Sequence, residues 1–200
     1  MGSKLRNSGF TLVEISIVLV IIGLILGGIL NSRSVFRNAQ TKDIIKAMNE
    51  MSTAAQQFKD RFGMWPGDYS NATASIAGLV CANGNGNGQV ETASETLCAT
   101  ESLIRAGMLR GTAGSPINVR GDSTVSITGA TQALTGISTD RLPANSTNVL
   151  RIQNIDCDIA IQIDRATDDG NVDTGIFRSA TTCAGQDEAI PVVSAVLKIN

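Results

Sequence analysis

The feature that most constrains this chain is an almost unbroken apolar run near its start. Residues 10–30 form a run of 21 residues with a single charged side chain, Glu14. A helix needs about 20 apolar residues to cross the hydrocarbon core of a bilayer, so the run predicts a membrane-spanning helix. The residues before it include Lys4 and Arg6 and no acid. Because positive residues beside a first apolar segment stay in the cytoplasm, we expect a cytoplasmic N-terminus.

A cleaved secretory signal peptide is the competing interpretation of the same run. Signal peptides have a shorter apolar region that ends at a small-x-small cleavage site. Here the apolar run continues into Asn31-Ser32-Arg33-Ser34 without an Ala-x-Ala sequence. The sequence therefore favours a helix that is retained.

Glu14 is the anomaly of this run. A carboxylate inside a lipid-facing segment is costly and usually marks a functional position. The next cation along the chain is Arg33, which is too far away to pair with Glu14 within one helix. Either its partner comes from another molecule, or the residue lies shallow enough for its carboxylate to reach the membrane surface.

Residues 9–14, Gly-Phe-Thr-Leu-Val-Glu, resemble the processing site of type IV prepilins and of the related type II secretion pseudopilins. In that family a membrane-embedded prepilin peptidase cuts after the Gly that ends a short basic leader. The resemblance implies cleavage between Gly9 and Phe10 and N-methylation of Phe10. It also implies that Glu14, the fifth mature residue, pairs with the N-terminal amine of a neighbouring subunit during assembly, since two buried charges each need the other.

The helix is expected to continue beyond the membrane. Apolar residues follow at spacings of three and four, which is the period of an amphipathic helix: Ile44, Met48, Met51, Ala55, Phe58 and Phe62. Gly63 and Pro66 predict its end. The expected organisation is a cleaved leader (1–9), a transmembrane and assembly half of the helix (10–31), an amphipathic half (32–62) and a globular head (63–200).

In the first part of the head, the sequence predicts an exposed loop followed by a helix. Residues 83–88 contain three consecutive Asn-Gly pairs, which predict an exposed loop. A helix is expected over 94–110, capped by Ser94 or Thr92 and ended by Gly111. Leu97, Glu101, Ile104 and Met108 lie on one side of this expected helix.

The rest of the head predicts β-structure. Apolar residues alternate at period two, which is typical of strands, over 123–128, 148–153 and 158–164, and an apolar stretch over 191–199 predicts a last strand. We expect these strands to form an antiparallel sheet laid against the apolar stripe of the long helix. The predicted fold class is α+β and pilin-like.

The four cysteines lie on the predicted outer side of the membrane. They are Cys81, Cys98, Cys157 and Cys183. No pair has C-x-x-C spacing and the chain has no histidine, so a zinc site is disfavoured. An even number of cysteines in an exported head predicts two disulfides. Of the three possible pairings we favour Cys81–Cys98 and Cys157–Cys183, the second of which encloses a surface loop, as the pilin resemblance implies.

An acidic turn lies between the last two predicted strands. Its oxygen-bearing side chains are Asp168, Asp169, Asn171 and Asp173. With a backbone carbonyl and water they could approach the six to eight oxygen ligands that calcium takes. Their spacing does not fit an EF-hand loop, and an acidic turn satisfied by its own hydrogen bonds is the alternative. Calcium is therefore a candidate, and no other cofactor is expected.

Composition argues against catalysis and against nucleic-acid binding. Without histidine the chain cannot contain a Ser-His or Cys-His hydrolase site, and no nucleophile, base and orienting residue occur in a recognisable set. A formal net charge of −2 and the absence of a basic stripe in the sequence give no indication of a nucleic-acid partner. We expect no enzyme.

The resemblance implies a structural subunit of a type IV pilus filament that serves surface adhesion or motility. Other pilins, the prepilin peptidase and the inner-membrane assembly machinery are the implied partners. The subunit would cross the bacterial inner membrane once before assembly and lie in an extracellular filament afterwards. A pseudopilin of a type II secretion or DNA-uptake system is the alternative, and the large head with four cysteines favours the pilin.

Overall fold

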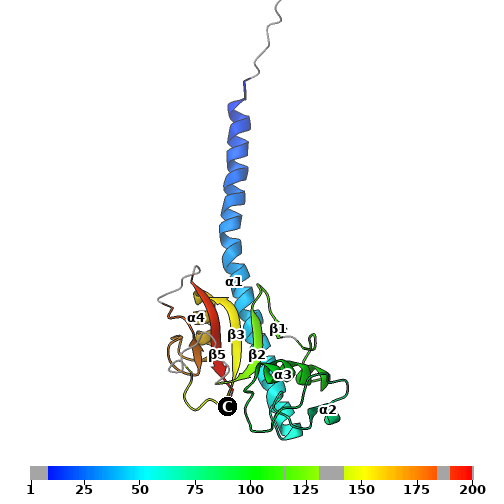
Figure 1. Cartoon of the computed structure of the whole chain (residues 1–200). Helices are drawn as coiled ribbons and strands as arrows, with labels where there is room; N and C mark the ends of the chain where they lie inside the picture. Colours follow the sequence, from blue (N-terminus) through cyan, green and yellow to red (C-terminus); the bar gives the residue numbers. More distant parts are fainter. Residues whose placement is uncertain (1–8, 115, 131–141, 184–189, 200) are drawn as a thin grey trace, which may run out of the picture. The chain divides into compact units, whose positions relative to one another are not determined.

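The computed structural model describes residues 9–114, 116–130, 142–183 and 190–199. The chain divides into two compact units, Met1–Ala39 and Gln40–Asn200. Figure 1 shows the order of the elements along the chain. The architecture is α+β, as predicted: a long N-terminal helix is followed by a five-stranded antiparallel sheet and shorter helices.

The long helix α1 spans Leu12–Phe62 and begins in the first unit. Residues 12–30 of this helix rise about 28 Å, which matches the hydrocarbon thickness of a bilayer. This stretch is long and apolar enough to cross a membrane. Its large apolar side chains are exposed, from Leu12 at 87 % to Ile29 at 52 %. The helix therefore enters its apolar run where the sequence predicts and continues beyond it.

In the second unit, the remainder of α1 contributes one face to the core. The predicted stripe of Ile44, Met48, Met51, Ala55 and Phe58 is buried, and Phe62 packs at its end. The helix stops at Gly63, whose φ of 77° is accessible to glycine without strain. The Gly63 N–H donates to the Lys59 carbonyl at 2.8 Å, which closes the last turn as a C-cap.

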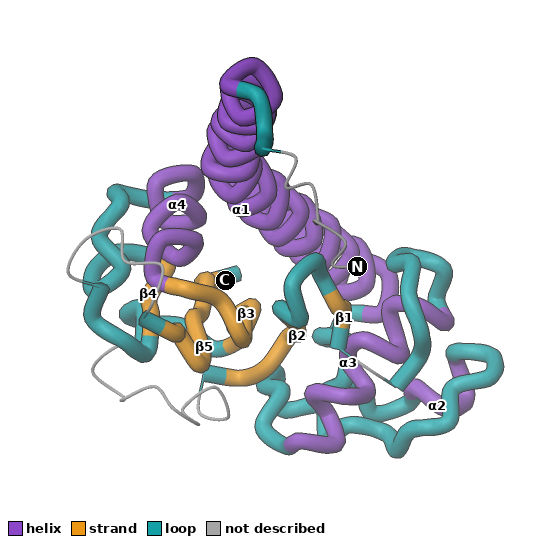
Figure 2. The backbone as a smooth tube through the Cα atoms, turned by 90° about the horizontal axis from the view of Figure 1, so that it is seen from above, coloured by secondary structure: helices purple, strands orange, loops and turns teal. Residues whose placement is uncertain are grey.

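The sheet has the strand order β1-β2-β3-β5-β4, and every neighbouring pair is antiparallel. The strands are β1 (Ile117–Asn118), β2 (Thr124–Gly129), β3 (Asn148–Asp156), β4 (Phe177–Ser179) and β5 (Pro191–Lys198). The strands predicted over 123–128, 148–153 and 191–199 are confirmed as β2, β3 and β5. Their inward residues join the stripe of α1 in one core, and Figure 2 shows the sheet beside this helix.

The strand predicted over residues 158–164 is wrong. These residues belong to the helix α4 (Cys157–Thr167), which is buried on nearly every side. A short apolar run buried all round gives no clear period, so its alternating isoleucines fit either structure. The end charges favour the helix, because Asp158 lies in its first turn and Arg165 in its last, where each complements the helix dipole.

The helix predicted over 94–110 is shorter than expected. The observed α3 spans Ala93–Arg105, after a very short helix α2 (Ala72–Ser75). Thr92 caps α3, and its side chain and that of Glu95 form a reciprocal capping box. Gly107, at φ 73°, ends α3 well before Gly111, because Met108 N–H reaches back to the Leu103 carbonyl at 2.9 Å.

The four residues expected on one side of this helix do not share one environment. Leu97 is 48 % exposed, Glu101 is buried, and Met108 lies beyond the end of α3. The apolar residues of α3 that are buried are Cys98, Ala99 and Leu103.

The Asn-Gly loop at residues 83–88 wraps around one buried carboxylate. Asp68 is fully buried and accepts hydrogen bonds from the N–H groups of Gly86 (2.8 Å), Asn87 (3.1 Å) and Gly88 (2.8 Å). Burial raises the pKa of the Asp68 carboxyl, and the three N–H groups offset part of that rise. A side chain at Gly84 would overlap the Asp68 backbone at 2.3 Å, so this position requires glycine.

We predict that Phe58→Ala strongly destabilises the fold. Phe58 is fully buried in the core formed by α1 and the sheet, and truncating such a residue costs about 3–5 kcal/mol. Denaturant titration of the full chain in detergent micelles, followed by the fluorescence of its single tryptophan, Trp65, measures the change. The exposed Lys42→Ala on the same helix is the control and should stay within about 0.5 kcal/mol of the parent. Equal midpoints for the two variants would contradict the assigned core.

Candidate functional site

The segment that precedes α1 is extended and exposed. Gly9, Phe10 and Thr11 are not helical, and the Phe10 side chain is 84 % exposed. A peptidase must bind its substrate backbone in an accessible form, and the Gly9–Phe10 bond lies in such a segment. The helix begins two residues after this bond, at Leu12.

The first turn of α1 is closed by Thr11 and Glu14. The Thr11 N–H donates to Glu14 Oε2 at 2.8 Å, and the Glu14 N–H donates to Thr11 Oγ1 at 3.3 Å. The Thr11 hydroxyl also donates to Glu14 Oε2 at 2.9 Å. This reciprocal pair is a capping box, in which N-cap and third helical residue satisfy each other's backbone donors.

The local partner of Glu14 was missed by the sequence analysis. The sequence predicted no cationic partner within the helix, but the hydroxyl and the backbone N–H of Thr11, three residues upstream, donate to the carboxylate. The signal was available, because Thr-x-x-Glu before an apolar run is the pattern of a capping box. Glu14 is thus hydrogen-bonded but carries no counter-charge among the described residues of α1 within reach of its first turn.

The surface around Glu14 is otherwise uniformly apolar. The side chains of Val13, Ile15 and Ile17 are 64 %, 49 % and 55 % exposed. The Ser16 hydroxyl donates back to the Val13 carbonyl at 2.9 Å, which satisfies it within the helix. Glu14 is the one ionisable side chain in residues 10–29. The apolar side chains around it can be buried only against lipid or other protein.

Two disulfides stabilise the second unit. The structure joins Cys81 to Cys98 and Cys157 to Cys183, with Cα–Cα distances of 5.6 Å and 5.5 Å. These are the pairs between neighbouring cysteines. The first bridge ties the loop before residue 83 to α3, and the second ties the start of α4 to the segment that follows β4. Disulfides of this kind persist in oxidising compartments.

The acidic turn that follows α4 gathers a different set of oxygens from the one predicted. Carboxylate oxygens of Asp164, Asp168 and Asp169 lie within 4.8 Å of one another. Asn171 and Asp173 instead form a local turn, in which the Asp173 N–H donates to Asn171 Oδ1 at 3.2 Å. The structure brings together two of the four predicted residues and adds Asp164, which the sequence analysis placed on a strand.

Asp164 is the unusual member of this cluster. Its side chain is fully buried, and neither carboxylate oxygen makes a hydrogen bond. Burial raises the pKa of Asp164 to about 6, and the negative charges of Asp169 and Asp168 add to the rise. The Gly170 N–H approaches the carboxylate and opposes the rise without reaching hydrogen-bond geometry.

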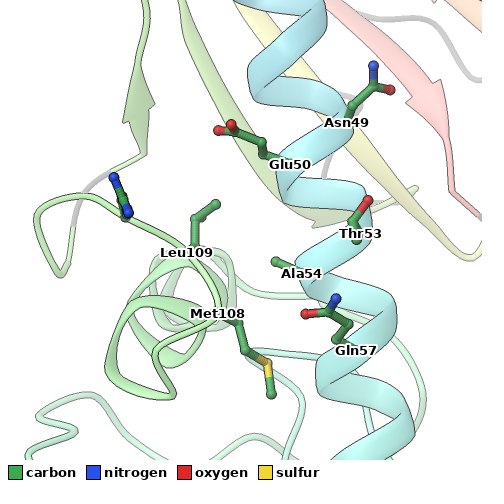
Figure 3. Close-up of a pocket in the computed structure, with 8 residues that line it drawn as sticks. Asn49, Glu50, Thr53, Ala54, Gln57, Met108 and Leu109 are labelled. Carbon is green, nitrogen blue, oxygen red and sulfur yellow. The ribbon is translucent and has the colours of Figure 1, made fainter.

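A groove of about 430 Å³ runs beside the second half of α1. Glu50, Ala54 and Gln57 face Met108 and Leu109 across it, as Figure 3 shows. Its carboxylate, Glu50, is exposed and lies 3.8 Å from Lys46.

Comparison with known proteins bears on the N-terminal segment. Residues 4–30 match the model of the prokaryotic N-terminal methylation motif, which is the signature of type IV pilins and pseudopilins. The match covers this N-terminal segment and supports a structural subunit of the pilin or pseudopilin type. The motif and the apolar helix together fit a membrane-anchored pilin that is later assembled into a filament. No curated protein and no solved structure matches the chain.

Proposed function

We propose that the chain is a structural subunit of a type IV pilus filament that serves surface adhesion or motility. It is cleaved by prepilin peptidase between Gly9 and Phe10, methylated at Phe10 and polymerised through the apolar half of α1. The observation that carries this proposal is the exposed apolar surface of residues 12–29 around the single carboxylate of Glu14.

Glu14 supplies the preference for another subunit over lipid. Inside a bilayer the apolar side chains of α1 are already well solvated, because lipid tails are as apolar as leucine. Apolar contact alone therefore does little to favour a neighbouring subunit. Lipid tails offer no cation, whereas cleavage after Gly9 creates a positive amine on Phe10 of each neighbour. Until that amine arrives, Thr11 satisfies the carboxylate of Glu14 through the capping box.

The orientation follows from the charges and the disulfides. Lys4 and Arg6 precede the span and favour the cytoplasm, whereas both disulfides lie beyond it and favour the oxidising side. The subunit thus crosses the inner membrane once with its N-terminus inside. From there the inner-membrane assembly machinery transfers it to the extracellular filament.

A pseudopilin of a type II secretion or DNA-uptake system is the second candidate. It shares the methylation motif and the apolar helix, so the first unit does not distinguish the two. The second unit favours the pilus, because its two disulfides and five-stranded sheet suit a subunit exposed on a long extracellular fibre.

Mass spectrometry of the native N-terminus tests processing. We expect the mature protein to begin at a methylated Phe10, with residues 1–9 absent. A second chain in which Gly9 is replaced by alanine, a position at which an added Cβ meets no neighbouring atom, tests whether cleavage needs the glycine. Native protein that retains its first nine residues and an unmodified Phe10 would refute the proposed processing.

We predict that Glu14→Ala leaves a processed, membrane-resident protein that assembles poorly. Losing a hydrogen bond to a charged group costs about 1.5–3 kcal/mol, so filament yield should fall at least about tenfold. Sheared surface fractions and membrane fractions, compared by immunoblot, measure the yield. Ser16→Ala is the matched control, since its hydroxyl bonds only its own helix. Normal amounts of filament from Glu14→Ala would count against the role of this residue.

We further propose that the acidic turn binds calcium. Asp164, Asp168 and Asp169 are the side-chain ligands supported by the structure, in place of the set Asp168, Asp169, Asn171 and Asp173 predicted from sequence. The supporting observation is Asp164, because a fully buried carboxylate without a hydrogen bond is costly unless a cation neutralises it. Calcium prefers such oxygen ligands and tolerates irregular geometry.

We predict a calcium-dependent increase in the melting temperature of the full chain. A calcium concentration 100 times the dissociation constant should raise it by roughly 5–10 °C above the value with chelator. Asp164→Asn should abolish this shift and raise the melting temperature measured with chelator, because it removes an unpaired buried charge. Asp173→Asn, an acid of the same turn outside the cluster, should retain the shift. The same melting temperature with calcium and with chelator in the parent would end the calcium proposal.

A further inference from the structure

The loop at residues 83–88 carries a reactive sequence that the proposed function does not use. It consists of Asn83-Gly84, Asn85-Gly86 and Asn87-Gly88, and all three asparagines are exposed. In an Asn-Gly pair the glycine nitrogen loses its proton and attacks Cγ of the preceding asparagine. The new N–Cγ bond replaces the bond to the side-chain nitrogen, which leaves as ammonia, and water then opens the succinimide to aspartate or isoaspartate. Glycine favours this step because it has no side chain to hinder the attack.

The structure engages each attacking nitrogen in a hydrogen bond. The Gly86 N–H donates to Asp68 Oδ1 at 2.8 Å, and the Gly88 N–H donates to Asp68 Oδ2 at 2.8 Å. The Gly84 N–H donates to the backbone carbonyl of Tyr69 at 3.1 Å. Two of the three nitrogens thus share one buried carboxylate, and the Gly86 N–H donates in addition to the backbone carbonyl of Asp68 at 2.9 Å. The Gly84 N–H has only a neutral main-chain acceptor among these bonds.

The asparagine carbonyls, in contrast, are activated. Asn85 Oδ1 accepts the Asn87 N–H at 3.0 Å, and Asn87 Oδ1 accepts the Gln89 N–H at 2.8 Å. A donor on this oxygen withdraws electron density from Cγ and stabilises the negative oxygen that forms during attack, as an oxyanion hole does. These two donors therefore make Cγ more electrophilic, so protection must come from the glycine nitrogen.

We propose that residues 83–88 are a latent deamidation site, and that the Asp68 carboxylate keeps Asn85 and Asn87 unreactive by holding the amide protons of Gly86 and Gly88. Removing either proton would create a negative nitrogen at hydrogen-bond distance from a negative, buried oxygen, which raises the cost of the reactive form. The protection is a property of the folded second unit and does not depend on filament assembly.

The same contacts explain why loss of protection would be damaging. Isoaspartate lengthens the main chain by one carbon, and either product adds a carboxylate to a loop that encloses another one. Asp68 is fully buried and bonded to three successive N–H groups of this loop, so a second charge beside it would be repelled. Deamidation at Asn87 should therefore break the hydrogen bonds between Asp68 and the N–H groups of this loop and release the loop from the carboxylate.

Site-resolved mass spectrometry tests the proposal on the purified full chain in detergent, incubated in mildly alkaline buffer. In the folded parent, deamidation at Asn85 and Asn87 should be at least about tenfold slower than in the same chain unfolded in guanidinium, the factor that one hydrogen bond to a charged group provides. Asp68→Ala should raise the rate at Asn87 by about the same factor while the fold persists. It should raise the rate at Asn85 by less, because the Gly86 N–H keeps its bond to the backbone carbonyl of residue 68. Asp68→Asn keeps one carbonyl oxygen and should give intermediate rates.

Asn83 is the internal control, because its glycine is held by Tyr69 and not by Asp68. It should stay slow in both Asp68 variants. Glu91→Gln removes an exposed acid near the loop without touching these bonds, and its rates should equal those of the parent. Equal rates in the folded and unfolded parent, or unchanged rates at Asn85 and Asn87 in Asp68→Ala, would overturn the proposal. A rise at all three asparagines in both Asp68 variants would assign the protection to the whole fold and overturn the role of Asp68.

Discussion

The structure depends on a helix that cannot satisfy its own surface. Residues 12–29 of α1 expose large apolar side chains all round, and no described part of the chain covers them. Such a surface is stable only in contact with lipid or with other protein, and in both environments an unpaired charge is costly. One carboxylate, that of Glu14, lies in this surface. The surface must be buried, and the buried carboxylate then needs a counter-charge. A pilin-type subunit differs from an ordinary membrane anchor in having this requirement.

The capping box adds a step to this account. A carboxylate in a membrane is costly unless hydrogen-bond donors are close to it. Thr11 does so with its hydroxyl and its backbone N–H, both of which are charge-assisted donors that leave the carboxylate ionised. The same two residues also start the helix. If Glu14 pairs with the N-terminal amine of a neighbouring subunit as proposed, local helix capping and that contact compete for one side chain.

The second unit holds two buried acids in different surroundings. Asp68 is hydrogen-bonded within the chain, whereas Asp164 lies in a cluster of acids. Asp68 is enclosed by three backbone donors and organises the Asn-Gly loop around itself. Asp164 is as deeply buried but has no donor, and two further carboxylates lie against it. The contrast identifies the first acid as a structural element of the loop and the second as a candidate ligand. One disulfide ties the segment before the Asn-Gly loop to α3, and the other holds the start of α4, which carries Asp164.

The sequence by itself determined the features that depend on local pattern. The apolar run, the stripe from Ile44 to Phe58, the stop at Gly63 and three of the five strands follow from periods of 3.6 and 2, which the backbone imposes on any chain. Only the tertiary structure decided that residues 157–167 form a helix, because Ile159, Ile161 and Ile163 alternate as in a strand and are nevertheless all buried on the helix. That helix brings Asp164 beside Asp168 and Asp169. Packing between separate segments places Asp68 inside the loop at 83–88, 18 to 20 residues further along the chain.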